Sequence, residues 1–134
     1  MIAHDMLASI RRQIADSVSL SKFEDGRISI SIPITYDDGD ACTCYAIHGE
    51  HGWELRDFGD LVMRASYRDV NLLSKGFLSR LKRVAEFYGM TADETGELFV
   101  AVDDENFGRA VFAFTQTCLA VQSLAKTKPE MEPT

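Results

Sequence analysis

Residues 52–66, GWELRDFGDLVMRAS, decide the fold that we expect for this chain. Trp53 and Leu55 alternate with polar residues, which is typical of a short strand with one covered face. An acidic turn that contains a glycine follows the strand, and Asp57 or Asp60 in this turn suits the cap of a short helix. The stretch therefore predicts a corner in which a strand of the sheet, a turn and a short helix connect the sheet to the helices packed on it.

A three-stranded meander is expected to lead into this corner. The clearest strand is residues 27–36, RISISIPITY, where isoleucines alternate with other residues, and its Pro33 indicates a sheet edge or a bulge. Residues 37–40, DDGD, are typical of a hairpin turn. A second strand over residues 41–47 and a third over 53–56 complete the meander.

Apolar residues at helical spacing predict the helices. An amphipathic helix is expected over residues 4–19, a further helix over 74–88 and the longest over 103–125. A fourth strand, GELFVAV at 96–102, lies between the last two helices, and residues 67–73 are expected to form a loop.

The expected order is therefore helix, three strands, two helices, strand and helix. Hairpins followed by helices predict an α+β fold, with a small, mainly antiparallel four-stranded sheet and helices packed mainly on one face. We expect a single domain over residues 1–125. The polar, proline-bearing segment KTKPEMEPT at 126–134 is expected to be a flexible C-terminal tail.

The composition is typical of a globular cytoplasmic protein. The 134 residues carry a net charge of -7, and no apolar run reaches the roughly 18 residues that span a bilayer. Cys42, Cys44 and Cys118 are expected to be reduced thiols that pack as small hydrophobic residues. The acidic charge argues against direct binding of duplex DNA and favours a basic partner.

Four segments resemble a known family across roughly residues 28–125. They read WELRDFGDLVMRA, LKRVAEFYGM, GELFVAV and ENFGRAVFAFTQTCLAVQSL. They resemble a bacterial and phage-borne family called domain of unknown function 1828, and the matching residues are Leu55, Asp57, Gly59, Asn106, Phe107, Gln116, Leu119, Ala120 and Val121. The family name brings no activity with it. The resemblance implies a protein carried by phages or mobile elements.

One alternative for the function is a metal-dependent nuclease. The expected order of elements is similar to the core of the PD-(D/E)xK nucleases, in which an acid near the second strand and an acid-x-Lys on the third hold Mg²⁺. Asp40, Glu54 and Arg56 stand at those places, with Arg56 in place of the lysine. A guanidinium is a poor base, and the same residues also fit a hairpin turn and a solvated strand face.

A second alternative is a transition-metal site at His48 and His51. Imidazole and carboxylate ligands suit such metals, and Glu50 and Glu54 lie close by in the sequence. A turn does not fix the geometry of these side chains, so exposed turn residues are the competing interpretation. We expect no cofactor, unless the nuclease alternative brings Mg²⁺.

Seven acidic residues are expected on or near the turns and outer face of the meander: Asp37, Asp38, Asp40, Glu50, Glu54, Asp57 and Asp60. Such a surface can imitate a row of phosphates and bind a basic, nucleic-acid-binding protein. We therefore expect a non-catalytic phage or mobile-element protein that binds a protein partner through these acids. Inhibition of a host defence complex, as by an anti-CRISPR protein, is one instance. The alternatives are the nuclease and an oligomerisation module, and the oligomeric state stays open.

Overall fold

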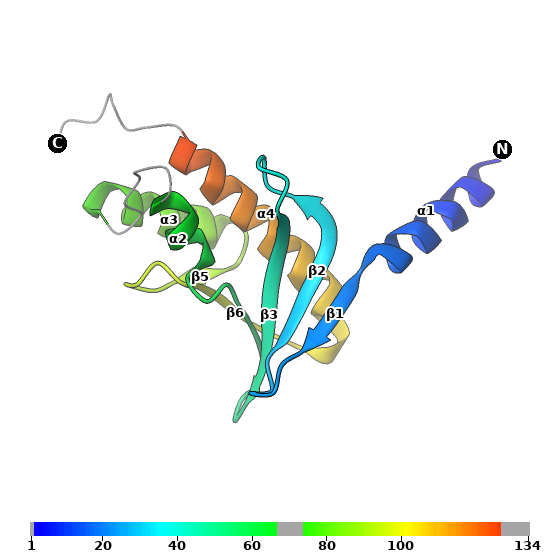
Figure 1. Ribbon diagram of the computed structural model, residues 1–134, viewed down its shortest axis with the longest axis horizontal. Helices are drawn as coiled ribbons and strands as arrows, with labels where there is room; N and C mark the ends of the chain where they lie inside the picture. The colour runs from blue at the N-terminus through cyan, green and yellow to red at the C-terminus, as the bar shows by residue number, and fades with distance from the viewer. Residues whose placement is uncertain (1, 67–73, 127–134) are drawn as a thin grey trace.

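A computed structural model gives the structure of residues 2–66 and 74–126 (Figure 1). The expected loop at 67–73, and all but the first residue of the expected tail, lie outside these residues. Within the two described ranges, no helix is long and apolar enough to cross a membrane.

Helices and strands follow one another as expected for an α+β fold. Their order and bounds are α1 (Ala3–Ser17), β1 (Ser19–Lys22), β2 (Ile28–Thr35), β3 (Ala41–Gly49), β4 (Gly52–Arg56), α2 (Asp60–Ser66), α3 (Lys75–Phe87), β5 (Thr91–Ala92), β6 (Leu98–Val102), the 3₁₀ helix η1 (Asp104–Asn106) and α4 (Phe107–Lys126).

The strands form an antiparallel sheet in the order β1-β2-β3-β4-β6-β5. The expectation of four strands is wrong, because the described residues contribute six. The two additional strands are the edges, β1 beside β2 and β5 beside β6. Both are short, four and two residues, so their own sequence pattern is too brief to signal a strand. Pairing with a longer neighbour stabilises them in the fold.

Pro33 lies where β2 loses its regular pairing. The register between β2 and β3 shifts between Ser31 and Thr35, and β1 pairs with β2 only as far as Ser31. A proline has no N–H to donate to a ladder, so it is tolerated where the ladder is interrupted. Of the two alternatives that Pro33 indicated, a sheet edge or a bulge, the structure shows an interruption of the ladder of the bulge kind.

The core lies between one face of the sheet and α4, which runs across that face (Figure 1). Alternate strand residues such as Ile30 and Leu55 are buried there, against Phe114 and Val121 of α4. Each such apolar side chain contributes roughly 1.5–3 kcal/mol through burial. α3 packs beside α4 and adds the fully buried Leu81.

The amphipathic first helix forms, but it does not join the core. None of the residues of α1 is buried, and Figure 1 shows the helix projecting from β1, away from α4. Met6, Leu7, Ile10 and Ile14 are between 42% and 49% exposed. In proteins, a helix of this length draws most of its stability from packing of its apolar face. No described part of the chain covers that face of α1.

Candidate functional site

The corner after β4 is built around a buried carboxylate. Asp57 is 1% exposed and accepts hydrogen bonds from the backbone N–H groups of Gly59 at 3.4 Å, Leu61 at 3.2 Å and Leu98 at 3.0 Å. The bond from Leu61 satisfies the first turn of α2, and the bond from Leu98 ties the corner to β6. Asp57, expected as a cap and also as a partner-binding acid, therefore lies inside the domain, where a partner cannot reach it.

Burial changes the ionisation of this carboxyl group. The loss of solvation on burial raises the pKa of Asp57 to about 6. The hydrogen bonds from Leu98, Leu61 and Gly59 favour the charged form and lower the pKa, but their effect is smaller than that of burial. Asp57 thus acts as a structural acid that holds the corner together.

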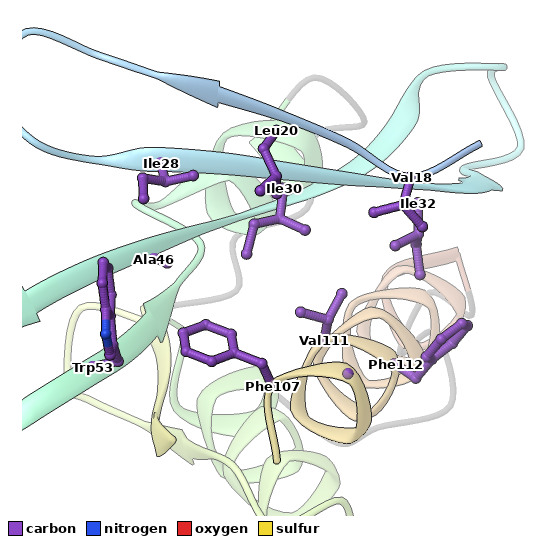
Figure 2. Close-up of a pocket in the computed structure, with 11 residues that line it drawn as sticks. Val18, Leu20, Ile28, Ile30, Ile32, Ala46, Trp53, Phe107, Val111 and Phe112 are labelled. Carbon is purple, nitrogen blue, oxygen red and sulfur yellow. The ribbon is translucent and has the colours of Figure 1, made fainter. Parts of the chain in front are cut away.

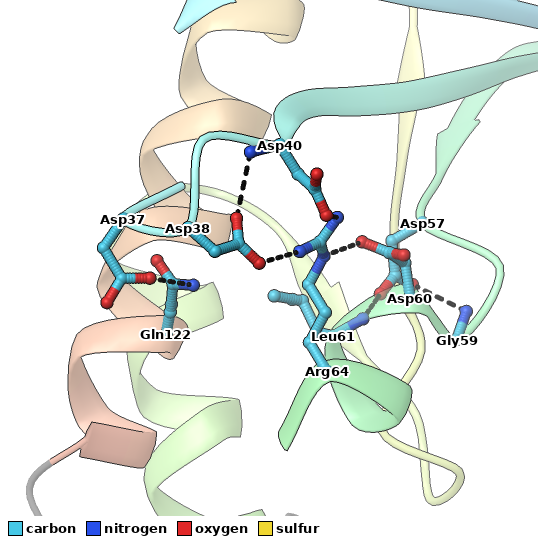
Figure 3. Close-up of polar contacts among 9 residues, drawn as sticks. All are labelled: Asp37, Asp38, Asp40, Asp57, Gly59, Asp60, Leu61, Arg64 and Gln122. Carbon is cyan, nitrogen blue, oxygen red and sulfur yellow. Dashed lines mark hydrogen bonds and ion pairs between the residues drawn. The ribbon is translucent and has the colours of Figure 1, made fainter. Parts of the chain in front are cut away.

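Four other acids meet at one end of the molecule, which we call the carboxylate end: Asp37, Asp38, Asp40 and Asp60 (Figure 3). Arg64 of α2 lies among three of them, with Nε 2.8 Å from Asp60 and its terminal nitrogens 3.2 Å from Asp38 and 3.3 Å from Asp40. Its guanidinium also lies over the ring of Tyr36, 4.2 Å from the centroid.

The sequence interpretation missed Arg64, although its i, i+4 spacing from Asp60 is a recognised signal for an ion pair. Gln122 of α4 was missed as well, and its amide donates to Asp37 across 3.1 Å. The carboxylate end is therefore partly neutralised and is fixed to both α2 and α4. Asp38 and Asp40 nevertheless keep 48% and 65% of their side chains exposed.

Glu54 and Arg56 lie on the face of the sheet opposite α4. Arg56 pairs with Glu54 and, at 2.9 Å, with Glu97, while its guanidinium lies 4.9 Å from the ring centroid of Phe99. Both nuclease candidates on this strand are thus engaged with each other.

The third nuclease candidate, Asp40, lies far from Glu54. Glu54 pairs in register with Ile47, seven positions along β3 from Asp40. At about 3.3 Å per strand residue, this separation is on the order of 20 Å. The ligands of one metal ion all lie within about 2.6 Å of it, so Asp40 and Glu54 do not form one metal site in this structure.

His48, expected in the turn, lies near the end of β3 and pairs with Trp53 of β4, while Glu50 and His51 form the turn between the two strands, at the far end of β3 from the carboxylate end. The ring of His48 packs edge-on against Trp53, with centroids 4.9 Å apart. Within residues 2–66 and 74–126, no three His, Cys, Asp or Glu side chains are arranged to hold a metal ion. The seven acids predicted as one surface are also divided, because Glu50 and the carboxylate end occupy opposite ends of the sheet.

The three cysteines are buried and unpaired, as expected. Burial raises the pKa of Cys42 to about 11 and that of Cys44 to about 12. Thiols with a raised pKa stay protonated at neutral pH and are poor nucleophiles. The cysteines therefore have a packing role, as small hydrophobic residues.

An apolar groove of about 410 Å³ opens between the sheet and the start of α4 (Figure 2). Its floor is formed by the buried side chains of Ile30, Ile32 and Val111. Trp53 and Phe107 pack edge-on at one end, with ring centroids 5.7 Å apart. The remaining lining residues are apolar too: Val18, Leu20, Ile28, Ala46, Gly108 and Phe112.

The groove exists because α4 covers only part of the isoleucine face of β2. Its rim stays open to solvent, with Val18 39%, Phe112 44% and Leu20 64% exposed. The sequence interpretation missed this groove. The signal available was a row of isoleucines on β2 together with an edge strand, β1, that carries a further apolar residue, Leu20, on a short and otherwise polar segment. A groove lined in this way suits an apolar side-chain stripe rather than a charged substrate.

Comparison with known proteins gives a family match. A family model described as "Domain of unknown function DUF1828" matches residues 32–121, well over half of the chain, and confirms the resemblance noted in the sequence. No curated protein and no solved structure matches the chain significantly. α1 and β1 precede the matched residues.

Proposed function

We propose that this chain, which belongs to the DUF1828 family, is a non-catalytic protein-interaction domain that binds its partner through the apolar groove and α1. The observation that carries this proposal is the presence, on one chain, of an open apolar groove and an amphipathic helix with an uncovered apolar face. Insertion of a helix into a groove is a recurrent mode of protein recognition, with anchors at i, i+3, i+4 and i+7.

The apolar face of α1 has helical anchor spacing, because Leu7, Ile10 and Ile14 stand at i, i+3 and i+7. Met6, Ile10 and Ile14 recur every four residues, and Leu7 flanks them on the same face. We call these four residues the α1 stripe. Leaving large apolar side chains in water is unfavourable, and contiguous exposed patches of this kind mark interaction sites. The α1 stripe and the groove are therefore two separate observations that both support a protein-interaction function.

Affinity capture from an extract that also contains an untagged copy of this chain tests this function with matched variants. We expect the wild-type chain to retain a protein in stoichiometric amount. The double variant Ile10→Asp, Ile14→Asp should lose it, because burying a charge in an apolar contact is costly. Ala8→Asp, which adds the same carboxylate on the opposite side of α1, should retain it. Equal capture by the stripe variant and the wild type, or no stoichiometric capture at all, would contradict the proposal.

A second interaction surface is supported by the carboxylate end. Asp37, Asp38 and Asp40 from the β2–β3 turn meet Asp60 of α2 (Figure 3), and three of these four carboxylates, those of Asp38, Asp40 and Asp60, pair with the guanidinium of Arg64. The local charge is negative and the chain as a whole carries -7. Such a surface suits a basic protein, including one that handles nucleic acid, and an anti-defence role in a phage or mobile element is the finer form of this proposal.

Charge reversal separates the two surfaces. We expect Asp38→Lys with Asp40→Lys to weaken capture of a basic partner and to leave the partner of the α1 stripe bound. Binding through charge should also weaken as salt rises from 0.05 to 0.5 M, because the Debye length falls from about 14 to about 4 Å. Capture that is insensitive to both charge reversal and salt would remove the carboxylate end from the proposal.

A further inference from the structure

We infer that the occupant of the apolar groove is α1 of a second copy of this chain, so that two copies exchange their first helices in a symmetric dimer. This inference rests on the proposed function, because it names the partner of the same groove.

Apart from Asp5 in its first turn, α1 lacks the features that stabilise a helix in isolation. Its 15 residues are at the limit for a stable isolated helix in water, its N-cap Ile2 makes no side-chain capping bond, and its last turn carries no basic residue. None of its residues is buried within the described chain. A helix with these properties needs a packing surface, and the α1 stripe is the face that would use it.

The groove has the matching chemistry. Every residue that lines it is apolar, and its exposed rim residues Val18, Leu20 and Phe112 would be covered by a helix lying along it. Trp53 and Phe107 form an aromatic wall at one end, where a methionine or isoleucine side chain can pack. No charged group would be buried by such contacts.

The connection between helix and groove favours exchange between copies. α1 ends at Ser17 and β1 begins at Ser19, so Val18 alone joins them, and its backbone is extended at φ -86° and ψ 132°. This extended residue directs α1 away from its own sheet (Figure 1). For α1 to reach the groove of its own chain, the direction of the chain would have to reverse within Val18 alone. A second copy presents the same groove to α1 and requires no change in the backbone of Val18. Exchange of an identical element between two copies is a known route to dimers.

The area is sufficient for a dimer. Ile2 and the α1 stripe on one side, and Val18, Leu20 and Phe112 on the other, are between 39% and 64% exposed. If each of these eight side chains loses about 80 Å² of exposed surface, the loss is roughly 600 Å² per copy and about 1,300 Å² for two copies. Stable interfaces bury about 1,200–2,000 Å² in total. The reciprocal arrangement is self-complementary, as a two-fold interface must be.

Gly108 allows the groove to be blocked without damage to the fold. It lines the groove, and a Cβ added there meets no atom within 4 Å. The residue lies in the first turn of α4, where a carboxylate is favourable and where glycine is a poor helix former. Gly108→Glu should therefore fold and carry a charge into the groove, and Gly108→Ala is its matched control.

Sedimentation velocity on the purified full-length chain tests the inference. Each chain has a mass of 15.0 kDa, so the wild type should sediment as a dimer of about twice that mass. We expect Ile10→Asp with Ile14→Asp, and separately Gly108→Glu, to raise the dimer dissociation constant on the order of a hundredfold, because each buries a charge in an apolar contact. Ala8→Asp and Gly108→Ala should leave it within a few-fold of the wild type. Circular dichroism checks that each variant is folded.

Three results would overturn the inference. A wild-type monomer at all concentrations would exclude the second copy, and a dimer that survives the stripe variant would exclude α1. A dimer that is lost in the stripe variant but kept in Gly108→Glu would show that helix packs on helix rather than in the groove. A monomer that still captures another protein through the α1 stripe would overturn this inference alone, whereas a monomer without any such capture would also overturn the proposed function.

Discussion

The carboxylate of Asp57 accepts a hydrogen bond of 3.0 Å from the backbone N–H of Leu98, 41 residues further along the chain. This bond joins the corner after β4 to the neighbouring strand β6, and two further N–H groups converge on the same carboxylate. The corner that organises the fold is therefore held by one buried side chain, and its removal has consequences that can be measured.

Replacing Asp57 by alanine should destabilise the whole domain. The substitution leaves the buried N–H groups of Leu61 and Leu98 without an acceptor, and unpaired buried donors are costly. We expect the free energy of unfolding to fall by about 2–4 kcal/mol. Urea denaturation followed by circular dichroism measures it. Asp60→Ala, in the same turn but with a partly exposed side chain, is the control and should cost less. An Asp57→Ala variant as stable as the wild type would contradict the role of the corner.

The raised pKa of Asp57 predicts a specific pH dependence. Its folded-state pKa of about 6 lies above the ordinary value of 3.8, so the folded protein binds more protons than the unfolded chain between these values. The resulting stability is fully present below pH 3.8 and is lost as the pH rises through 6. The difference between the two pKa values corresponds to about 3 kcal/mol.

Comparison with Asp57→Asn isolates this contribution from that of the other acids. We expect the stability of the wild type relative to Asp57→Asn to decrease by up to about 3 kcal/mol between pH 4 and pH 7. Denaturation at four pH values in this range measures the difference. A difference that is constant, or that increases with pH, would mean that Asp57 is not a buried acid with a raised pKa.

Arg64 should stabilise the carboxylate end. Without its guanidinium, Asp38, Asp40 and Asp60 repel one another, so we expect Arg64→Ala to cost about 1–2 kcal/mol at low salt. The cost should shrink in 0.5 M salt, because the repulsion is then screened. Arg64→Lys keeps the charge but not the planar donor geometry and should lie in between. Denaturation at two salt concentrations gives these values, and an Arg64→Ala variant with wild-type stability at low salt would refute this role.

Local patterns predicted the centre of the fold well. The alternating isoleucines of β2 and the pair Trp53 and Leu55 of β4 face the core as expected, because burial selects one face of a strand. The turn that follows β4 also leads into α2, as the glycine and the acids indicated. These features depend on residues close together in the sequence.

Features that depend on distant residues were not predictable in the same way. The alternating pattern of a strand shows which face of the sheet a residue occupies, but not how far the residue lies from residues on other strands. Asp40 and Glu54 were therefore assigned to one nuclease site, although about 20 Å separates them. The pattern of α1 gives an amphipathic helix, but it does not say whether the covering surface belongs to the same chain. The groove arises from the point at which α4 begins over β2, which only the tertiary structure determines.

Hydrogen exchange at the amides of α1 tests most directly whether its apolar face is covered by a second copy. At concentrations above the dimer dissociation constant, we expect the amides of Ala3–Ser17 to be protected. Their protection should fall on dilution and in Gly108→Glu, while the core amides of β3 and α4 stay protected. The contrary result is fast exchange of α1 at every concentration, or protection that neither dilution nor Gly108→Glu reduces. Either result would show that no second copy covers the α1 stripe.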